Sequence, residues 1–204
     1  LWLSAVATAL CLLIGYPFAF ILARQKPVWR NVLLVLMMLP FWTNSLIRTY
    51  AIKIILGKKG LVNTLLVGTG IVDEPLSLLY TEFAVIFGLV YILLPFMVLP
   101  LMASFEQLSK EYVEAARDLQ ANAWQRFIHI TLPMISPTLF FVLVTNIIGS
   151  FQSFTTVYVV SGGTGGPANS TMMYVLWLYL LAFRQFRMGF ASALAWVFFA
   201  IIML

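Results

Sequence analysis

Few side chains in this sequence could take part in a reaction, and they form no catalytic pattern. His129 is the only histidine and Cys11 the only cysteine. Neither has a base, nucleophile or second ligand at a spacing that would build a catalytic dyad or a metal site. The glycine-rich run 162–166 lacks the Lys-Ser/Thr ending of a phosphate-binding loop, which favours an ordinary flexible loop. The sequence therefore predicts no catalytic residue, no metal and no cofactor of its own.

A polar, helix-prone stretch has the composition of a docking surface instead. It lies between two long apolar runs, and we refer to residues 106–131 as the docking loop. Small side chains in it would let another backbone approach closely, and a carboxylate would make polar contacts with a partner. The residues that define the pattern are Glu114, Ala115, Ala116, Gln120, Ile130, Leu132 and Pro133.

The docking loop reads as two short helices. Ser109 can cap a helix that begins at Lys110. Position 120 should follow its end in a left-handed conformation, where Gly is usual and Gln costs on the order of 1 kcal/mol. Asn122 can cap a second helix over 123–130, which Pro133 should separate from the next apolar run.

Four polar residues inside apolar runs are candidates for lining a translocation path: Asn44, Arg48, Asn146 and Gln152. An arginine at this depth either faces a cavity or extends its charge to the interface. The amides either bond neighbouring helices or line the path. Both interpretations stay open at this point.

The composition requires that these residues be placed by membrane-spanning helices. The 204 residues are 62% hydrophobic and 9% charged, with a mean hydropathy of +0.99, which no soluble domain of this size needs. We predict an all-α polytopic membrane protein, one domain over 1–204, with spans at about 1–23, 31–55, 83–105, 132–160 and 187–204. Apolar runs reach both ends, so we expect part of a longer subunit.

Basic residues favour a cytoplasmic docking loop. Arg24, Lys26 and Arg30 crowd the connection between the first two predicted spans, a density typical of the cytoplasmic side. The net charge of +5 is otherwise spread along the chain, so no nucleic-acid surface is predicted. Membrane lipid is the expected surrounding.

The segment EAARDLQANAWQRFIHITLP resembles the docking loop of permease subunits of bacterial ABC importers of the first type, with Gln120 where that family has Gly. The resemblance implies a multi-pass, non-catalytic subunit of the bacterial inner membrane. It also implies two ATPase subunits that bind the ATP, a second permease subunit and an extracytoplasmic solute-binding protein. A secondary transporter or channel is a remoter alternative, since no carboxylate lies well inside a span.

The two halves of the chain resemble different branches of that family. Residues 1–119, with LPFWTNSLIRTYAIKIIL, are similar to spermidine/putrescine permeases. Residues 120–204, with VYVVSGGTGGPANST, are similar to sugar and glycerol-phosphate permeases. This change of resemblance fits both a natural intermediate between the two branches and an engineered or generated hybrid of them. The longer resemblance slightly favours a polyamine as substrate, with a sugar or glycerol phosphate as the alternative.

Overall fold

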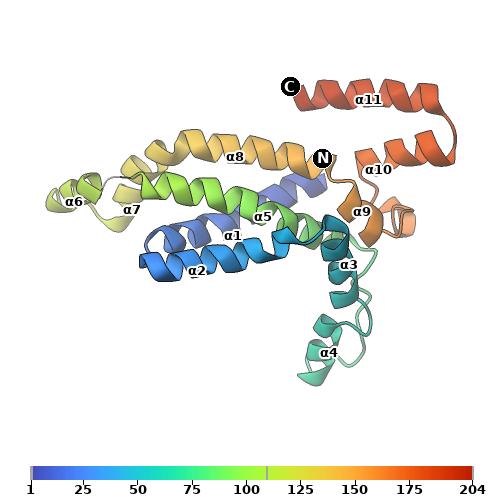
Figure 1. The fold of residues 1–204 in the computed structure, drawn as a ribbon, viewed down its shortest axis with the longest axis horizontal. Helices are drawn as coiled ribbons and strands as arrows, with labels where there is room; N and C mark the ends of the chain where they lie inside the picture. The colour runs from blue at the N-terminus through green and yellow to red at the C-terminus, as the bar shows by residue number, and fades with distance from the viewer. Residues whose placement is uncertain (1, 109, 204) are drawn as a thin grey trace. The chain divides into compact units, whose positions relative to one another are not determined.

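The computed structural model describes residues 2–108 and 110–203, and every regular element in them is a helix (Figure 1). The chain divides into two compact units. One comprises Leu1–Ala7, Pro40–Ile92 and Ile148–Leu204, and the other comprises Thr8–Leu39 and Leu93–Ile147. The helices α1 (Trp2–Ala23), α5 (Glu82–Glu106) and α8 (Leu132–Gln152) contribute residues to both units.

Three helices in the described residues are long and apolar enough to cross a bilayer. These are α1 with 22 residues, α5 with 25 and the continuous helix Ala123–Gln152 with 30. A fourth candidate is a broken pair, Pro27–Trp42 and Ser45–Ile55. The polytopic all-helical fold is thereby confirmed. The predicted span 187–204 corresponds to α11 (Met188–Met203), which is shorter at 16 residues, so its crossing stays a prediction.

The predicted span 31–55 is a broken pair of helices, bent by 98°. The chain forms α2 (Pro27–Met38), the 3-10 helix η1 (Leu39–Trp42) and then a separate helix α3 (Ser45–Ile55). Pro40 has no amide hydrogen to continue the helical ladder. The Thr43 hydroxyl donates to the Pro40 carbonyl over 2.7 Å, and the Asn44 side chain accepts from the Leu46 amide, which starts α3.

The predicted span 132–160 is likewise divided between two helices. Helix α8 stops at Gln152, and α9 (Thr155–Val160) begins anew. The Ser153 amide bonds the Ser150 carbonyl at 3.3 Å, a bond three residues back that closes the final turn. The sequence pattern missed this break because both sides of it are apolar.

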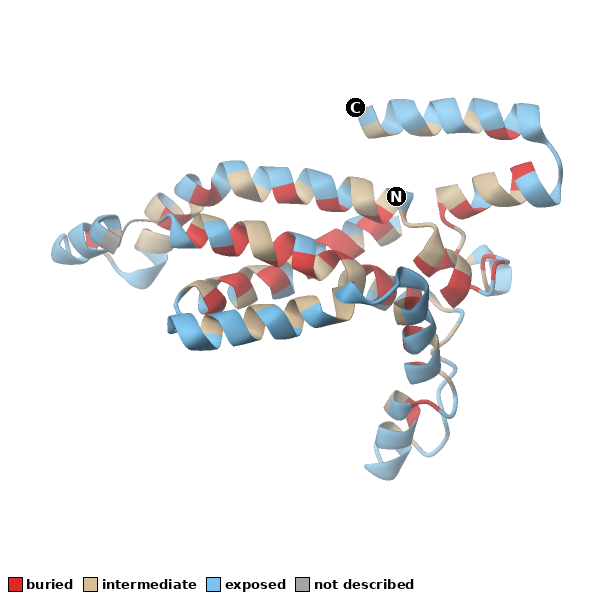
Figure 2. Cartoon of the chain, viewed as in Figure 1, coloured by how far each residue is buried: buried red, intermediate tan, exposed pale blue. Residues whose placement is uncertain are grey.

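In the unit that contains the docking loop, α1 packs against α5 through small side chains. Cys11, Gly15 and Ala19 are buried at helical spacing. Figure 2 shows buried residues recurring along the helices of this unit. A Cβ built on Gly15 would lie only 3.0 Å from Cγ of Met97 in α5. Small residues at this interface let the two backbones approach closely, as in other membrane helices. The close approach at Gly15 holds α1 and α5 together in this unit.

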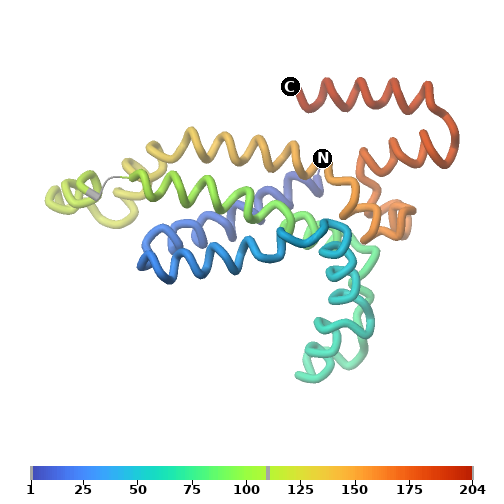
Figure 3. The backbone as a smooth tube through the Cα atoms, in the orientation of Figure 1, coloured from blue at the N-terminus to red at the C-terminus, as the bar shows by residue number. Residues whose placement is uncertain are grey.

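In the other unit, close contacts join α3, α5 and α9. A Cβ on Gly88 would lie 2.6 Å from Cγ2 of Thr156, so α5 and α9 pack closely here. Farther along, α10 (Tyr174–Tyr179) and the π-helix η4 (Leu180–Arg184) lead into α11, and the chain reverses between them (Figure 3). The Tyr174 hydroxyl donates to the Leu194 carbonyl over 2.8 Å, which fastens this pair.

In the same unit, hydrogen bonds between nearby residues order the connections between helices. Helix α4 (Leu61–Gly68) presents Asn63, whose side chain bonds the carbonyls of Gly57 and Leu76 and the amide of Leu76. The glycine-rich run forms turns before the short 3-10 helix η3 (Pro167–Asn169). Four of its glycines have positive φ, between 65° and 86°. Glycine suits such turns because it lacks a Cβ.

Candidate functional site

The first helix of the docking loop is α6 (Lys110–Asp118), with nine residues. Glu111 lies in its first turn, where a carboxylate faces the positive end of the helix dipole. The predicted cap, Ser109, lies outside the described residues. Ala116 is only 7% exposed, whereas Glu114 and Ala115 are exposed. The two alanines therefore differ: Ala116 packs within its own chain, and Ala115 faces outward.

The predicted left-handed position at Gln120 is confirmed. Gln120 has a φ of 60°. Its amide donates to the Arg117 carbonyl over 2.9 Å, and the Ala121 amide donates to the Ala116 carbonyl over 3.0 Å. This pair of bonds is the Schellman arrangement that ends helices where a residue turns left-handed. The direction of α6 relative to the residues that follow is therefore set by backbone bonds.

Asn122 begins the second helix of the loop, as predicted. Its side-chain oxygen accepts from the Gln125 amide over 2.8 Å, and the Gln125 side chain accepts from the Asn122 amide over 2.9 Å. This reciprocal capping box satisfies two amides that a helix start would otherwise leave open. Helix α7 (Ala123–Arg126) follows from it.

Pro133 does not separate this helix from the next span, so that prediction is wrong. Helix α7 continues through the π-helix η2 (Phe127–Thr131) directly into α8. The Leu132 amide donates to the Phe127 carbonyl, five residues back. A wider π turn moves the carbonyl that the proline ring would otherwise meet, and Pro133 has no amide to place. The second helix of the docking loop and α8 are thus one continuous helix from Ala123 to Gln152.

Three of the seven residues of the predicted docking pattern line two hollows. Gln120 and Ile130 line a small one of about 370 Å³, together with His129, whose Nδ1 lies 3.0 Å from the Gln125 carbonyl. Glu114 lines a larger one of about 1050 Å³. Leu132 is half-buried and Pro133 exposed, both in the first turn of α8.

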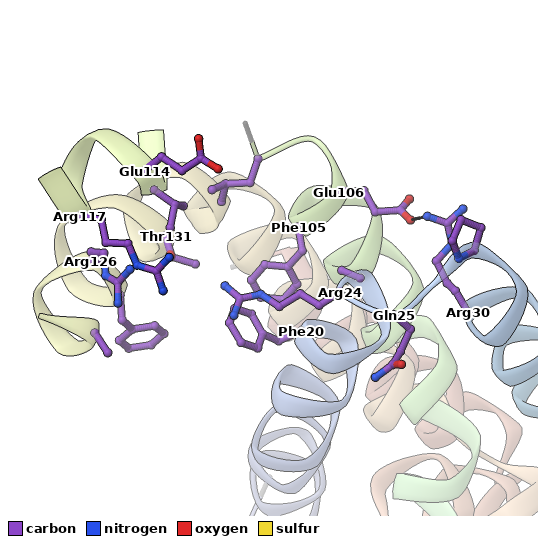
Figure 4. Close-up of a pocket in the computed structure, with 16 residues that line it drawn as sticks. Phe20, Arg24, Gln25, Arg30, Phe105, Glu106, Glu114, Arg117, Arg126 and Thr131 are labelled. Carbon is purple, nitrogen blue, oxygen red and sulfur yellow. Dashed lines mark hydrogen bonds and ion pairs between the residues drawn. The ribbon is translucent and has the colours of Figure 1, made fainter. Parts of the chain in front are cut away.

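The larger hollow brings together two segments distant in sequence, residues 20–30 and 105–131; we refer to it as the basic hollow (Figure 4). Four arginines line it, namely Arg24, Arg30, Arg117 and Arg126. Arg30 forms an ion pair with Glu106. The Arg24 guanidinium lies over the Phe20 ring, with 3.7 Å between Cζ and the ring centroid. In the sequence analysis, Arg24 and Arg30 served only to predict which side of the membrane the first connection faces. Their positive charge could also have suggested the ion pair with Glu106.

The first connection and the docking loop therefore lie at the same end of this unit. Such an arrangement agrees with the predicted cytoplasmic placement of both, which rests on the basic residues and on the docking pattern.

The four candidate path residues have different surroundings. Asn44 is exposed and caps α3, and Gln152 is exposed at the end of α8. Arg48 stacks on Phe41, with Cζ 4.3 Å from the ring centroid. Its Nε and Nη1 are buried and have no hydrogen-bond partner among the described residues. No hydrogen bond joins Asn44, Arg48 and Gln152 within the described part of their unit.

Asn146 belongs to the other unit and is 2% exposed. Its Nδ2 donates to the Val142 carbonyl over 2.8 Å. Its Oδ1 is buried and accepts no hydrogen bond from the described residues. An unpaired buried carbonyl oxygen costs about 1–3 kcal/mol, so Asn146 is suited to receive a donor from elsewhere.

Comparison with known proteins agrees with this fold. The sequence family described as "Binding-protein-dependent transport system inner membrane component" matches residues 15–204. The crystal structure of a bacterial alginate ABC transporter in complex with alginate pentasaccharide-bound periplasmic protein contains a chain that is similar over 100% of this chain and 73% of its own. The TM-score is 0.79 at 19% identity, a likeness that shows the fold alone.

Curated relatives include two spermidine/putrescine transport system permease proteins PotB. That of Haemophilus influenzae is 55% identical over 135 residues, which are 66% of this chain and 47% of the relative. That of Escherichia coli K12 is 41% identical over 192 residues, 94% of this chain and 68% of the relative. The lactose transport system permease protein LacF of Rhizobium radiobacter is 29% identical over 170 residues, 81% of this chain and 57% of the relative.

The chain thus spans about half to two thirds of the length of these curated relatives. An alignment of 192 residues out of 204 necessarily crosses position 120. The likeness to polyamine permeases is therefore not confined to residues 1–119. The alignment with LacF crosses the same position at lower identity.

Proposed function

The chain belongs to the family of inner membrane components of binding-protein-dependent transport systems, and on that premise we propose that it acts as the permease subunit of an ATP-driven importer of a small hydrophilic solute. It is a multi-pass protein of the bacterial inner membrane and a non-catalytic subunit, as predicted. The expected partners are two ATPase subunits, a second permease subunit and an extracytoplasmic solute-binding protein.

The observation that supports the proposal most is the geometry of the docking loop. Its two helices are set against each other by backbone bonds at Gln120 and by the capping box at Asn122. Glu114 and Ala115 are exposed on α6. A soluble ATPase subunit would meet the carboxylate of Glu114 and could approach the backbone closely at Ala115. Gln120 and Ile130 would contribute from the small hollow beside them.

The continuity of α7, η2 and α8 supplies a route for coupling. A helix of 30 residues is about 45 Å long and resists bending along its bonded ladder. Movement of an ATPase against α7 would therefore be transmitted into the span α8. Rocking of spans against each other is how alternating access is commonly achieved in transporters. Leu132 and Pro133 lie where this helix leaves the docking loop.

For the substrate, the relatives favour a polyamine. The PotB proteins, which are named as spermidine/putrescine permeases, match at 41% to 55% identity. A sugar or glycerol phosphate is the second candidate, because the buried guanidinium of Arg48 has unpaired donors that suit hydroxyl or phosphate oxygens and would repel a polycation. Asn44, Asn146 and Gln152 are the other residues we propose along the path.

The test uses the full-length subunit, purified with its partner subunits and reconstituted in liposomes. ATP hydrolysis and solute uptake are measured with the binding protein loaded with spermidine, and separately with a sugar. Stimulation by the spermidine-loaded protein alone is expected. Stimulation by the sugar-loaded protein alone would move the substrate to the second candidate. Uptake that needs an ion gradient and no ATP would contradict the importer itself and favour a secondary carrier.

A further inference from the structure

We propose that the basic hollow, formed by residues 20–30 and 105–131, binds the phosphate group of an anionic phospholipid. It is a binding site separate from the substrate path, and Glu114 is the one residue of the predicted docking pattern that lines it. Three features carry the inference: the charge of its rim, the aromatic side chains of its floor, and its place at the ends of α1 and α5.

The rim of the hollow is positively charged, and three of its four arginines form no ion pair within the described residues. Arg30 and Glu106 pair with each other. The remaining charged lining residues are Arg24, Arg117 and Arg126 and the single carboxylate Glu114, which together carry a net charge of +2. No ion pair joins these three arginines to a carboxylate among the described residues, and the Glu114 carboxylate is directed away from Arg117 and Arg126 (Figure 4). Guanidinium groups prefer phosphate and carboxylate oxygens.

Contacts within the chain hold the side chains of Arg24 and Arg126 before any ligand arrives. The Arg24 guanidinium is held over the Phe20 ring. Arg117 lies at the end of α6, next to the Schellman turn, and Arg126 at the end of α7, where its Nε donates to the Asn122 carbonyl over 3.4 Å. Because the helix ends are fixed by backbone bonds, less freedom is lost when a phosphate binds.

The floor of the hollow is aromatic and continues into the spans. Phe105 lies edge-on to Phe20, with 5.4 Å between ring centroids, and edge-on to Tyr16 at 5.2 Å. Phe127 lies edge-on to Tyr16 at 5.9 Å. Phe20 and Phe105 belong to the last turns of α1 and α5, Phe127 begins the π-helix η2, and Tyr16 lies farther inside α1. A phospholipid offers a phosphate for the rim and acyl chains for this floor.

The alternative occupant is an acidic segment of a partner protein. It would satisfy the arginines, but it would leave the apolar floor without a matching surface. Basic pockets near the ends of membrane helices on the cytoplasmic side attract anionic headgroups. The mixture of charged rim and aromatic floor therefore favours lipid.

The experiment measures lipid binding to the full-length subunit in neutral detergent by native mass spectrometry. Phosphatidylglycerol and phosphatidylcholine are titrated separately. Wild type should retain a phosphatidylglycerol molecule that the double variant R117Q/R126Q loses, with at least about tenfold weaker binding expected for the loss of two basic residues. The variant R117K/R126K should keep most of the binding. The control R184Q/R187Q changes two exposed arginines outside the hollow and should bind as wild type does.

Thermal melting checks that R117Q/R126Q remains folded. Equal retention of phosphatidylglycerol by R117Q/R126Q and wild type, or equal retention of phosphatidylcholine, would overturn the proposal. Displacement by millimolar inorganic phosphate would show a site for free anions and not for lipid, which also overturns it. Loss of the ATPase subunit with lipid binding unchanged would assign the hollow to a protein partner. Failure of ATP-driven transport alone would leave the lipid site standing.

Discussion

Gln120 occupies a backbone conformation that glycine adopts without steric cost. Its φ of 60° follows from the Schellman bonds at the end of α6. Its side chain is exposed, so no packing of that side chain offsets the strain. The alternative in which α6 continues through position 120 is contradicted by this conformation.

Replacing Gln120 by Gly should therefore stabilise the protein. We expect Gln120→Gly to raise the free energy of unfolding by up to about 1 kcal/mol, because it removes the Cβ from a left-handed position. The melting temperatures of the two forms in one detergent measure the effect. Gln107→Gly is the matched control, since Gln107 is exposed at the end of α5 and does not have a positive φ. A lower melting temperature for the position-120 variant would contradict the Schellman arrangement.

Ala115 and Ala116 allow the docking contact to be separated from folding. We expect Ala115→Trp to weaken copurification of the ATPase subunit and transport while the melting temperature stays near that of wild type, because Ala115 is exposed. Ala116→Trp should lower the melting temperature, since overpacking a buried site costs roughly 1–3 kcal/mol.

Copurification and melting temperature are measured on both variants. Normal ATPase association and transport for Ala115→Trp would remove that face of α6 from the docking surface. A stable, fully active Ala116→Trp would contradict the burial of that side chain.

At the scale of elements, Asn44 caps the start of α3 after the break that follows η1. This structural role is separate from its proposed contact with the translocation path. Asn44→Ala should cost about 1 kcal/mol, because the side chain no longer accepts from the Leu46 amide. Asn44→Ser keeps an oxygen that can cap α3 and should keep the stability.

Uptake by the two Asn44 variants then separates the two roles. Normal uptake by Asn44→Ser would mean that Asn44 acts only as a cap. Impaired uptake at unchanged stability would support contact with the substrate path. A fully stable Asn44→Ala would contradict the capping role.

At the scale of the whole molecule, the proposed topology can be tested by labelling in intact cells. Cysteines at Lys26 and Asn122 should react only from the cytoplasmic side, and a cysteine at Ala168 only from outside. Ala168 is exposed and already has a Cβ, whereas a Cβ on Gly165 would lie 2.5 Å from Cε of Met172. The buried Cys11 is replaced by Ala as background. Labelling of position 122 from outside would reverse the topology.

Local sequence rules predicted the ends of the docking helices. The left-handed turn at Gln120 and the cap at Asn122 depend on residues within a few positions of each other, so they follow from backbone geometry alone. The same reasoning failed at Pro133, because the chain accommodates proline with a π turn and does not end the helix.

By itself, the sequence determined the membrane class, the helical fold and the location of the docking loop, because hydropathy and helix capping are properties of short segments. Only the tertiary structure decided that Ala116 is buried while Ala115 is exposed, and that Arg24 and Arg30 line one hollow with Arg117 and Arg126. These relations join residues up to about a hundred positions apart. They depend on how α1 packs against α5, and no local pattern in the chain encodes that packing.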